Sequence, residues 1–275
     1  MINPVSLLQR LARGRIPLLS AALAGLVALA LNAAAAESPA AIHPPLKVLL
    51  LTGGGYHDYK TLVPRLTNEI GKRVLATFDV RFDIESLHDP KFADQFDAVI
   101  YDICFDEAPD DVLENAIQAT KKGKPTVMIH CAVHAFRHSP KIHEWETCCG
   151  MRSKVHDRFE GFTVQKLDPE SPITKFFPQE WSTAGDELYQ TISIDPDSHQ
   201  LLKAKSPQDG RVHVVCWTYQ FGKGRVFSTT LGHDLKTAGT PEYLRLLSNG
   251  LLWACDKLDA NGEPAAGFSA APPKP

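Results

Sequence analysis

The sequence predicts a doubly wound α/β fold, in which a mostly parallel sheet carries helices on both faces. Three observations indicate it: short apolar runs recur at the length of buried strands, segments with helical spacing separate them, and polar residues follow the runs directly. In such an alternation each helix returns the chain to the same edge of the sheet, so the strands run parallel through right-handed crossovers.

Five apolar runs are the predicted strands of this sheet. They cover residues 47–51, 80–84, 98–101, 125–129 and 225–230. The first run is apolar without interruption, which is typical of a strand that is buried on both faces. We therefore place residues 47–51 near the centre of the sheet.

Three segments between or after these runs have helical character. Apolar residues recur every fourth position over residues 62–70, which predicts a helix packed on the sheet. A second helix is predicted to begin at Asp110 or Asp111, either of which can cap it. The last helix begins at Thr240, a capping residue, and Pro241 fits its first position.

The chain divides into four parts on composition. Residues 1–36 read as a secretory signal peptide, residues 37–46 as a short lead-in and residues 47–258 as one domain. Within this domain, residues 159–218 are less regular and are interpreted as an elaborated insertion. Residues 259–275 are rich in Pro, Ala and Gly and are predicted to be a disordered tail.

The signal peptide is predicted from its layout. Three arginines precede a charge-free apolar run, which ends in the small residues Ala34, Ala35 and Ala36. The run is shorter than the roughly 20 residues that span a bilayer, so cleavage is favoured over a membrane anchor. We expect a periplasmic or secreted protein that begins near Glu37 and is not stably inserted in a membrane.

Charge and cysteine content exclude other classes. The formal net charge is −3, whereas nucleic-acid binders need clustered excess Lys and Arg. Among the six cysteines no C-x-x-C spacing occurs, which argues against a structural zinc site. Cys104, Cys131 and Cys216 lie in or beside apolar runs and are interpreted as buried free thiols. Export would permit disulfides, but their connectivity cannot be deduced from sequence.

Polar and titratable residues follow several of the predicted strands. In open α/β sheets, ligands bind outside the carboxyl ends of the strands, so these residues should meet at one edge. They include Gly54, Gly55, Tyr56 and His57 after the first strand, Asp102 after the third, His130 and His134 after the fourth, and His233 and Asp234 after the last.

The histidines permit more than one interpretation. His233 with Asp234 is the strongest signal, because a histidine oriented by a neighbouring group is the usual acid or base of an enzyme. His130 and His134 have a spacing that suits a metal only if the segment is helical, and His130 ends a strand. His57 could be an exposed loop histidine, a reading that His156 and His199 fit better.

Several motifs together resemble the ThuA-like (trehalose utilisation) family. They are Gly53-Gly-Gly-Tyr-His57, His130 before a small Ala132, Asp186-Glu187-Leu188-Tyr189, Gly222-Lys-Gly-Arg-Val-Phe227 running into Thr230-Leu-Gly-His-Asp234, and Trp253. The likeness spans residues 47–257. It implies a flavodoxin-like fold of the class I glutamine amidotransferase type and a link to sugars, with oxidised (3-keto) sugars the best association. One departure is Ser171-Pro172, where the family often has His-Pro.

With this resemblance, the strand-end residues become a predicted site for a small carbohydrate. The predicted catalytic residues are His233 as the group that transfers a proton, Asp234 or Glu187 to orient it, and His57 and His130 to polarise the substrate oxygen. The predicted substrate-binding residues are Gly54, Gly55, Tyr56, Asp186 and Tyr189. A divalent metal held by some of His57, His130, Glu187 and His233 is an alternative to pure acid/base chemistry, and no other cofactor is predicted.

Two other functions stay open at this point. Cys131 falls where amidotransferases place their nucleophile and could pair with His233, although Ile129 and Val133 are β-branched and ill suited to a strained nucleophile turn. The chain could also bind carbohydrate without turnover. Three tryptophans could then stack on sugar rings, with core packing as their other use: Trp145, Trp181 and Trp217.

Overall fold

A computed structural model describes residues 43–270 of the chain. The predicted signal peptide and nearly all of the lead-in therefore lie outside the described residues. Within residues 43–270, no helix combines the length and apolar character that crossing a membrane requires.

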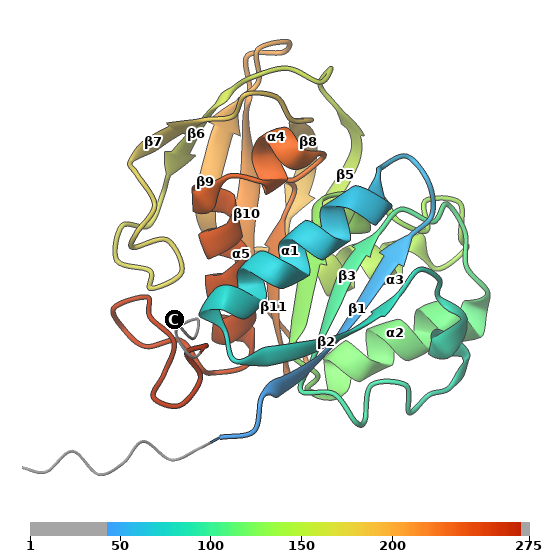
Figure 1. The fold of residues 1–275 in the computed structure, drawn as a ribbon. Coiled ribbons are helices and arrows are strands. Elements are labelled where there is room, and N and C mark those ends of the chain that lie inside the picture. Colours follow the sequence, from blue (N-terminus) through green and yellow to red (C-terminus); the bar gives the residue numbers. More distant parts are fainter. Residues whose placement is uncertain (1–42, 271–275) are drawn as a thin grey trace, which may run out of the picture. The chain divides into compact units, whose positions relative to one another are not determined.

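A nine-stranded sheet forms the centre of the described part, in the order β2-β1-β3-β4-β11-β10-β9-β6-β7 (Figure 1). Its parallel half consists of β1 (Leu46–Gly53), β2 (Ala76–Arg81), β3 (Ala98–Ile103), β4 (Thr126–Ile129) and β11 (Gly224–Thr229). The other half is antiparallel and consists of β6 (Thr163–Lys166), β7 (Glu180–Ser182), β9 (His199–Lys205) and β10 (Val212–Phe221). A separate pair joins β5 (Met151–His156) to β8 (Tyr189–Ile194).

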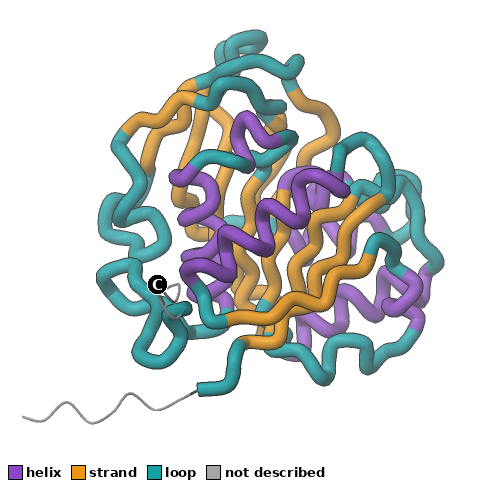
Figure 2. The backbone as a smooth tube through the Cα atoms, viewed as in Figure 1, coloured by secondary structure: helices purple, strands orange, loops and turns teal. Residues whose placement is uncertain are grey.

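Helices cover both faces of the sheet, as Figure 2 shows. One face packs against α1 (Tyr59–Arg73) and α5 (Pro241–Ala254), and the other against α2 (Asp110–Lys122) and α3 (Ile142–Cys149). Alternate residues of β1 belong to the two layers: Val48 and Leu50 pack on the α1 side, whereas Leu49 and Leu51 pack on the α2 side. The predicted doubly wound α/β fold is thus confirmed.

Some element boundaries differ from the sequence-based expectation. The second strand is β2, several residues earlier than the apolar run at 80–84. α1 begins at Tyr59 behind an Asp58 cap, and α2 begins after Pro109, so Asp110 and Asp111 lie in its first turn and do not cap it. The irregular region 159–218 forms the antiparallel half of the sheet, which the sequence did not indicate.

The expectation of a disordered tail is wrong for residues 259–270. The Ala265 N–H donates to the carbonyl of Lys257 at 2.8 Å, and the Ala270 N–H donates to the carbonyl of Arg73 at 3.0 Å. Phe268 packs against the core layer that contains α1 and α5. This segment therefore belongs to the folded domain.

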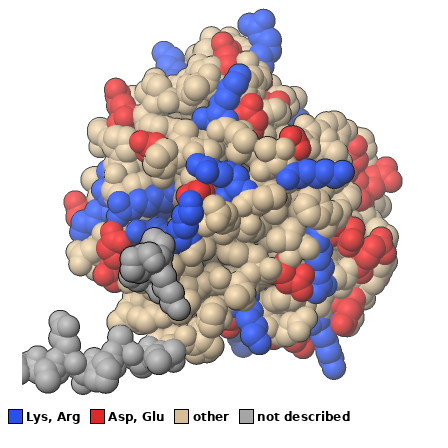
Figure 3. All heavy atoms as spheres, in the orientation of Figure 1, with Lys and Arg blue, Asp and Glu red and all other residues tan. Residues whose placement is uncertain are grey.

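Basic and acidic side chains are mixed on the face seen in Figure 3. Such a mixture differs from the continuous basic stripe that follows a nucleic-acid backbone. That the chain does not bind nucleic acid stays a prediction.

Candidate functional site

Three histidines meet at the carboxyl edge of the parallel strands. His57 follows β1, His130 follows β4 directly, and His233 follows β11. Their ring centroids lie 5.0 Å (His57–His130), 4.8 Å (His57–His233) and 5.4 Å (His130–His233) apart. One nitrogen from each ring lies within 4.8 Å of the other two, a spacing that one metal ion could bridge.

Glu187, just before β8 in the chain, adds a carboxylate to this group. Its Oε2 lies 3.2 Å from His233 Nδ1 and 3.5 Å from His130 Nε2, and its Oε1 lies 3.8 Å from His156 Nδ1. Burial opposes ionisation of Glu187, but hydrogen bonds from His130 and His233 outweigh it and hold its pKa well below the usual value. Glu187 is therefore a carboxylate facing imidazoles.

His130 is fixed from behind by a backbone carbonyl. Its Nδ1 lies 2.6 Å from the carbonyl oxygen of Thr230, which can only accept, so Nδ1 carries the hydrogen and Nε2 faces Glu187. Burial lowers the pKa of His130, yet the Glu187 hydrogen bond and the Asp186 charge outweigh this and raise it. A positive charge, either a proton or a metal ion, is thus favoured between Nε2 and Glu187.

His57 is a neutral imidazole. Burial, followed by the neighbouring His130 and His233, lowers its pKa to about 3. Both of its ring nitrogens are buried and have no hydrogen-bond partner among residues 43–270. An unsatisfied buried polar group costs about 1–3 kcal/mol. A metal ion that takes the lone pair of His57 would satisfy one of its two unpartnered nitrogens, so the residues present fit a divalent ion.

The backbone of His233 is positioned by Asp186. This fully buried carboxylate accepts hydrogen bonds from the N–H groups of Gly232 at 2.8 Å and His233 at 3.2 Å. Gly232 has φ +113°, and a Cβ there would overlap the hydroxyl of Tyr243. Asp186 therefore positions His233 from inside the protein and does not face a substrate, contrary to our expectation.

Two further residues have roles other than those expected. Of the two carboxylates expected to orient His233, Asp234 or Glu187, it is Glu187 that contacts the ring. The Asp234 side chain instead accepts from the Lys236 N–H at 2.8 Å and caps the short helix α4 (Leu235–Ala238). Tyr189, an expected substrate contact, is 1 % exposed, and its hydroxyl lies 3.5 Å from His130 Nε2. Its ring stacks on His134, at 3.9 Å between centroids. Tyr189 thus supports His130.

Three residues of the loop after β1, namely Gly54, Gly55 and Tyr56, were expected to contact substrate, and the structure places them differently. Gly54, at φ +98°, lies against the backbone of Cys104, where a Cβ would overlap the peptide. The close backbone approach that Gly54 allows is therefore to the Cys104 peptide and not to a ligand. A Cβ on Gly55 would meet nothing within 4 Å among the described residues, so this position is open. Tyr56 is 66 % exposed, and its hydroxyl donates to Asp106 at 2.9 Å.

Three residues around the cluster were given no catalytic or binding role from the sequence. His156, interpreted as an exposed loop histidine, lies at the end of β5 beside Glu187. The ring of Phe159 lies 5.1 Å from that of His233. Asp102, the penultimate residue of β3, has Oδ2 unpartnered among the described residues, and burial raises its pKa to about 7 despite His130. Only Asp102 carried a signal, as an acid at a strand end.

The cysteines differ from the prediction. Cys104 and Cys131 form a disulfide with their Cα atoms 5.2 Å apart, whereas Cys216 is a buried free thiol as expected. The residue in the strained turn after β4 is His130, with φ +47°, so Cys131 is neither at the turn position nor a thiol. A cysteine nucleophile at Cys131 is thus unsupported.

The tryptophans do not supply an evident sugar platform. Trp145 and Trp217 are fully buried, and Trp181 packs edge-on against Phe177 with ring centroids 5.6 Å apart. Core packing accounts for the first two.

Solved structures confirm the fold type at low identity. A protein described as ThuA-like from Parabacteroides merdae is 21% identical, with a TM-score of 0.64 over 82% of this chain and 96% of that one. Another from Bacteroides uniformis is 16% identical, with a TM-score of 0.63 over 83% and 98%. A protein described as a GMP synthase subunit from Thermoplasma acidophilum is 14% identical, with a TM-score of 0.51 over 78% and 96%.

A search of curated proteins finds no match. The family model described as "Trehalose utilisation" matches residues 47–254, which contain His57, His130 and His233. The chain therefore belongs to the ThuA family.

Proposed function

We propose that the protein is an exported enzyme that acts on a sugar or sugar derivative, with oxidised (3-keto) sugars the favoured class, by metal-assisted chemistry at the histidine cluster. The observation that carries the proposal is the convergence of His57, His130, His233 and Glu187 at one sheet edge. A non-catalytic carbohydrate binder would not need four titratable groups brought within contact distance.

The donor set suits a catalytic divalent ion. Imidazole and carboxylate ligands fit Zn²⁺, Fe²⁺ or Ni²⁺, and ligand atoms from three histidines leave room for a substrate oxygen. When bound, such an ion polarises a carbonyl or hydroxyl oxygen as a Lewis acid. The family's description as trehalose utilisation supports a sugar as the bearer of that oxygen.

The chain's own residues supply orientation and proton transfer. Thr230 holds the tautomer of His130, and Asp186 holds the backbone of His233. His156 is 40 % exposed on its side chain and contacts Glu187 through Nδ1 without belonging to the three-histidine group, so we assign it as a group that exchanges a proton with bound substrate. Its Nδ1 lies 2.8 Å from the carbonyl of Asp157, which leaves Nε2 as the exchanging atom.

The test combines metal content with turnover. Metal-free protein is loaded separately with Zn²⁺, Ni²⁺ and, without oxygen, Fe²⁺, and each form is assayed on oxidised and unoxidised disaccharides with and without chelator. We expect turnover of oxidised substrates that a chelator abolishes and added metal restores. Glu187→Gln and His57→Ala should lose both metal and turnover. His199→Ala, whose imidazole pairs with Asp168 at 2.7 Å, is the matched control and should retain both.

Each contrary result has a distinct meaning. If turnover is insensitive to chelator, the metal-assisted mechanism is wrong, and acid/base chemistry by the His233–Glu187 pair takes its place. Saturable sugar binding without turnover would identify a binding protein instead of an enzyme.

A further inference from the structure

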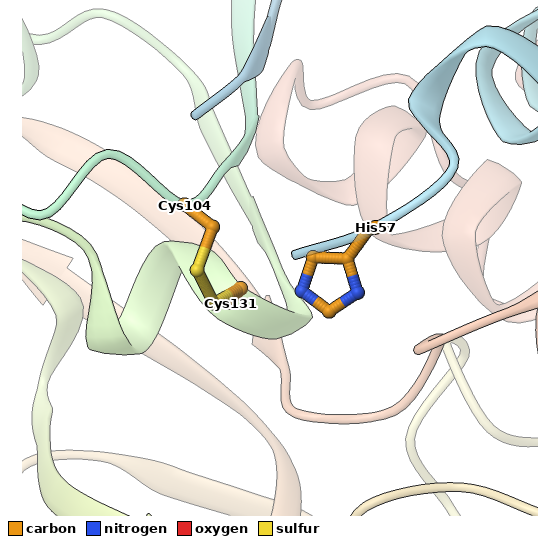
Figure 4. A group of neighbouring side chains, drawn as sticks. All are labelled: His57, Cys104 and Cys131. Atoms are coloured by element: carbon orange, nitrogen blue, oxygen red, sulfur yellow. A yellow bond between two sulfur atoms is a disulfide. The ribbon is translucent and has the colours of Figure 1, made fainter. Parts of the chain in front are cut away.

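The Cys104–Cys131 disulfide lies against the ring of His57, as Figure 4 shows. One ring nitrogen of His57 and the two sulfurs all lie within 4.8 Å of one another. His57 therefore belongs to two groups of candidate ligands: the one with His130 and His233, and this second one with the cysteines.

The backbone fixes the His57 loop against Cys104. The Cys104 N–H donates to the carbonyl of Gly53 at 2.8 Å, and Gly54 touches the peptide that follows Cys104 so closely that a Cβ would not fit. The position of His57 relative to the sulfurs thus follows from main-chain packing as well as from side-chain rotamers. Its ring nitrogens are the buried, unpartnered atoms already described.

Arg137 places a positive charge beside both sulfurs. Its Nη2 lies 3.1 Å from Cys104 Sγ and 3.9 Å from Cys131 Sγ, while its Nε binds Asp106 at 2.8 Å. A neighbouring guanidinium stabilises a thiolate relative to a thiol, whereas it gives a disulfide little. The surroundings of this pair are therefore suited to its reduced form as well as to its oxidised form.

We propose that Cys104 and Cys131 form a redox-gated metal site, which in the dithiol state binds a thiophilic divalent ion together with His57. Reduction by a dithiol adds two electrons and two protons: the S–S bond breaks, each sulfur becomes a thiol, and the reductant closes its own disulfide. Metal binding then releases both thiol protons to solvent. Two thiolates and one imidazole are a zinc ligand set that leaves the fourth position open.

His57 is shared by the histidine cluster and the proposed thiolate site, so one ion cannot leave both sites complete. A metal held by the thiolates takes His57 away from His130 and His233, so reduction would move the ion or weaken its retention at the histidine cluster. This inference goes beyond the proposed sugar chemistry and does not depend on it.

The experiment compares the oxidised and reduced full-length protein with Co²⁺ as the probe. Reduced protein is prepared with dithiothreitol, desalted without oxygen and titrated, because cobalt thiolates have intense charge-transfer absorption that imidazole and carboxylate complexes lack. We expect this absorption to saturate at one equivalent in the reduced protein and to be absent from the oxidised protein. Reduced protein that binds Co²⁺ without this absorption would overturn the proposal, and so would reduced protein that does not bind it.

Variants assign the ligands. Cys104→Ser and Cys131→Ser should each lose most of the absorption, and His57→Ala should weaken Co²⁺ binding by more than the 10–100-fold that loss of an outer-shell partner typically costs. Cys255→Ser, at a free and partly exposed cysteine, is the control and should retain the absorption. Persistence of the full signal in Cys104→Ser would place the metal on other cysteines and refute the site.

Glu187→Gln separates this inference from the proposed function. It should abolish Co²⁺ binding by the oxidised protein while leaving the thiolate absorption of the reduced protein intact. Loss of the thiolate signal in this variant, with circular dichroism unchanged, would refute an independent second site. Sugar turnover is not needed for any of these measurements.

Discussion

Replacing Asp186 with Asn tests whether an interior carboxylate positions the candidate site. Asp186 Oδ2 accepts from the N–H of Gly232, and Oδ1 accepts from those of His233 and Glu187. An Asn has one oxygen, so its best orientation keeps the two N–H groups at Oδ1 and turns an NH₂ group toward Gly232. One buried N–H then loses its acceptor, at a cost of about 1–3 kcal/mol.

A second contribution acts in the opposite direction. Burial raises the pKa of Asp186, so its folded-state pKa lies above that of the unfolded chain and ionisation of the folded protein costs stability. This cost grows as the pH rises from the unfolded pKa to the folded pKa, and Asp186→Asn removes it. We therefore expect a net loss below 3 kcal/mol at neutral pH, or a fall in Tm of at most about 12 °C at 2–4 °C per kcal/mol.

The effect of Asp186→Asn on the site should exceed its effect on the fold. Because the N–H of Gly232, the residue before His233, loses its acceptor, the position of His233 is held less firmly, and metal affinity should fall by about 10–100-fold, the usual cost of losing an outer-shell partner. Differential scanning calorimetry and metal titration measure the two effects on one preparation. Asp168→Asn, at the exposed pair with His199, should change neither by more than about 1 kcal/mol. Wild-type metal affinity in Asp186→Asn would refute the positioning role.

Three other predictions follow from the structure and the sequence. His233→Ala should lower turnover by about 10²–10⁴-fold with little change in Tm, because its side chain is 24% exposed; equal turnover in His233→Ala and His199→Ala would place the site elsewhere. Asp102 has a folded pKa near 7, above its unfolded value, so it costs stability progressively as the pH rises from about 4 to 7; Asp102→Asn should flatten that part of a pH series of unfolding free energies. The exported protein should begin at or near Glu37, and N-terminal sequencing that returns the full chain from a membrane fraction would contradict export.

The sequence was informative wherever burial on both faces leaves a clear pattern. The apolar run of β1 was recognisable because both of its faces are buried, and the four-residue spacing of α1 because its buried residues form one face. The meeting of His57, His130 and His233 followed from the rule that parallel strands end at one edge. The rule depends only on which residues follow each strand. Errors of a few residues in the predicted strand boundaries therefore did not change the predicted site.

The remaining features depend on contacts between distant residues, which no local pattern encodes. The sequence left Asp234 and Glu187 open as the carboxylate that orients His233. The contact with Glu187, forty-six positions earlier, is visible only in the fold. The Cys104–Cys131 disulfide depends on the pairing of β3 with β4, which brings two separate loops together. The role of His156 depends on how β5 and β8 pair, and neither strand has a strong apolar signature.

The place of β11 in the sheet has a consequence for the order of folding. This strand comes late in the sequence, yet it lies between β4 and β10 in the sheet. The carbonyl that holds His130, that of Thr230, is therefore 100 residues away in sequence. Pairings over such separations must meet a large loop-closure cost before they are rewarded, and they fold slowly. We therefore expect the histidine cluster to assemble late in folding, and a chain that is truncated before β11 would contain His57 and His130 but lack His233.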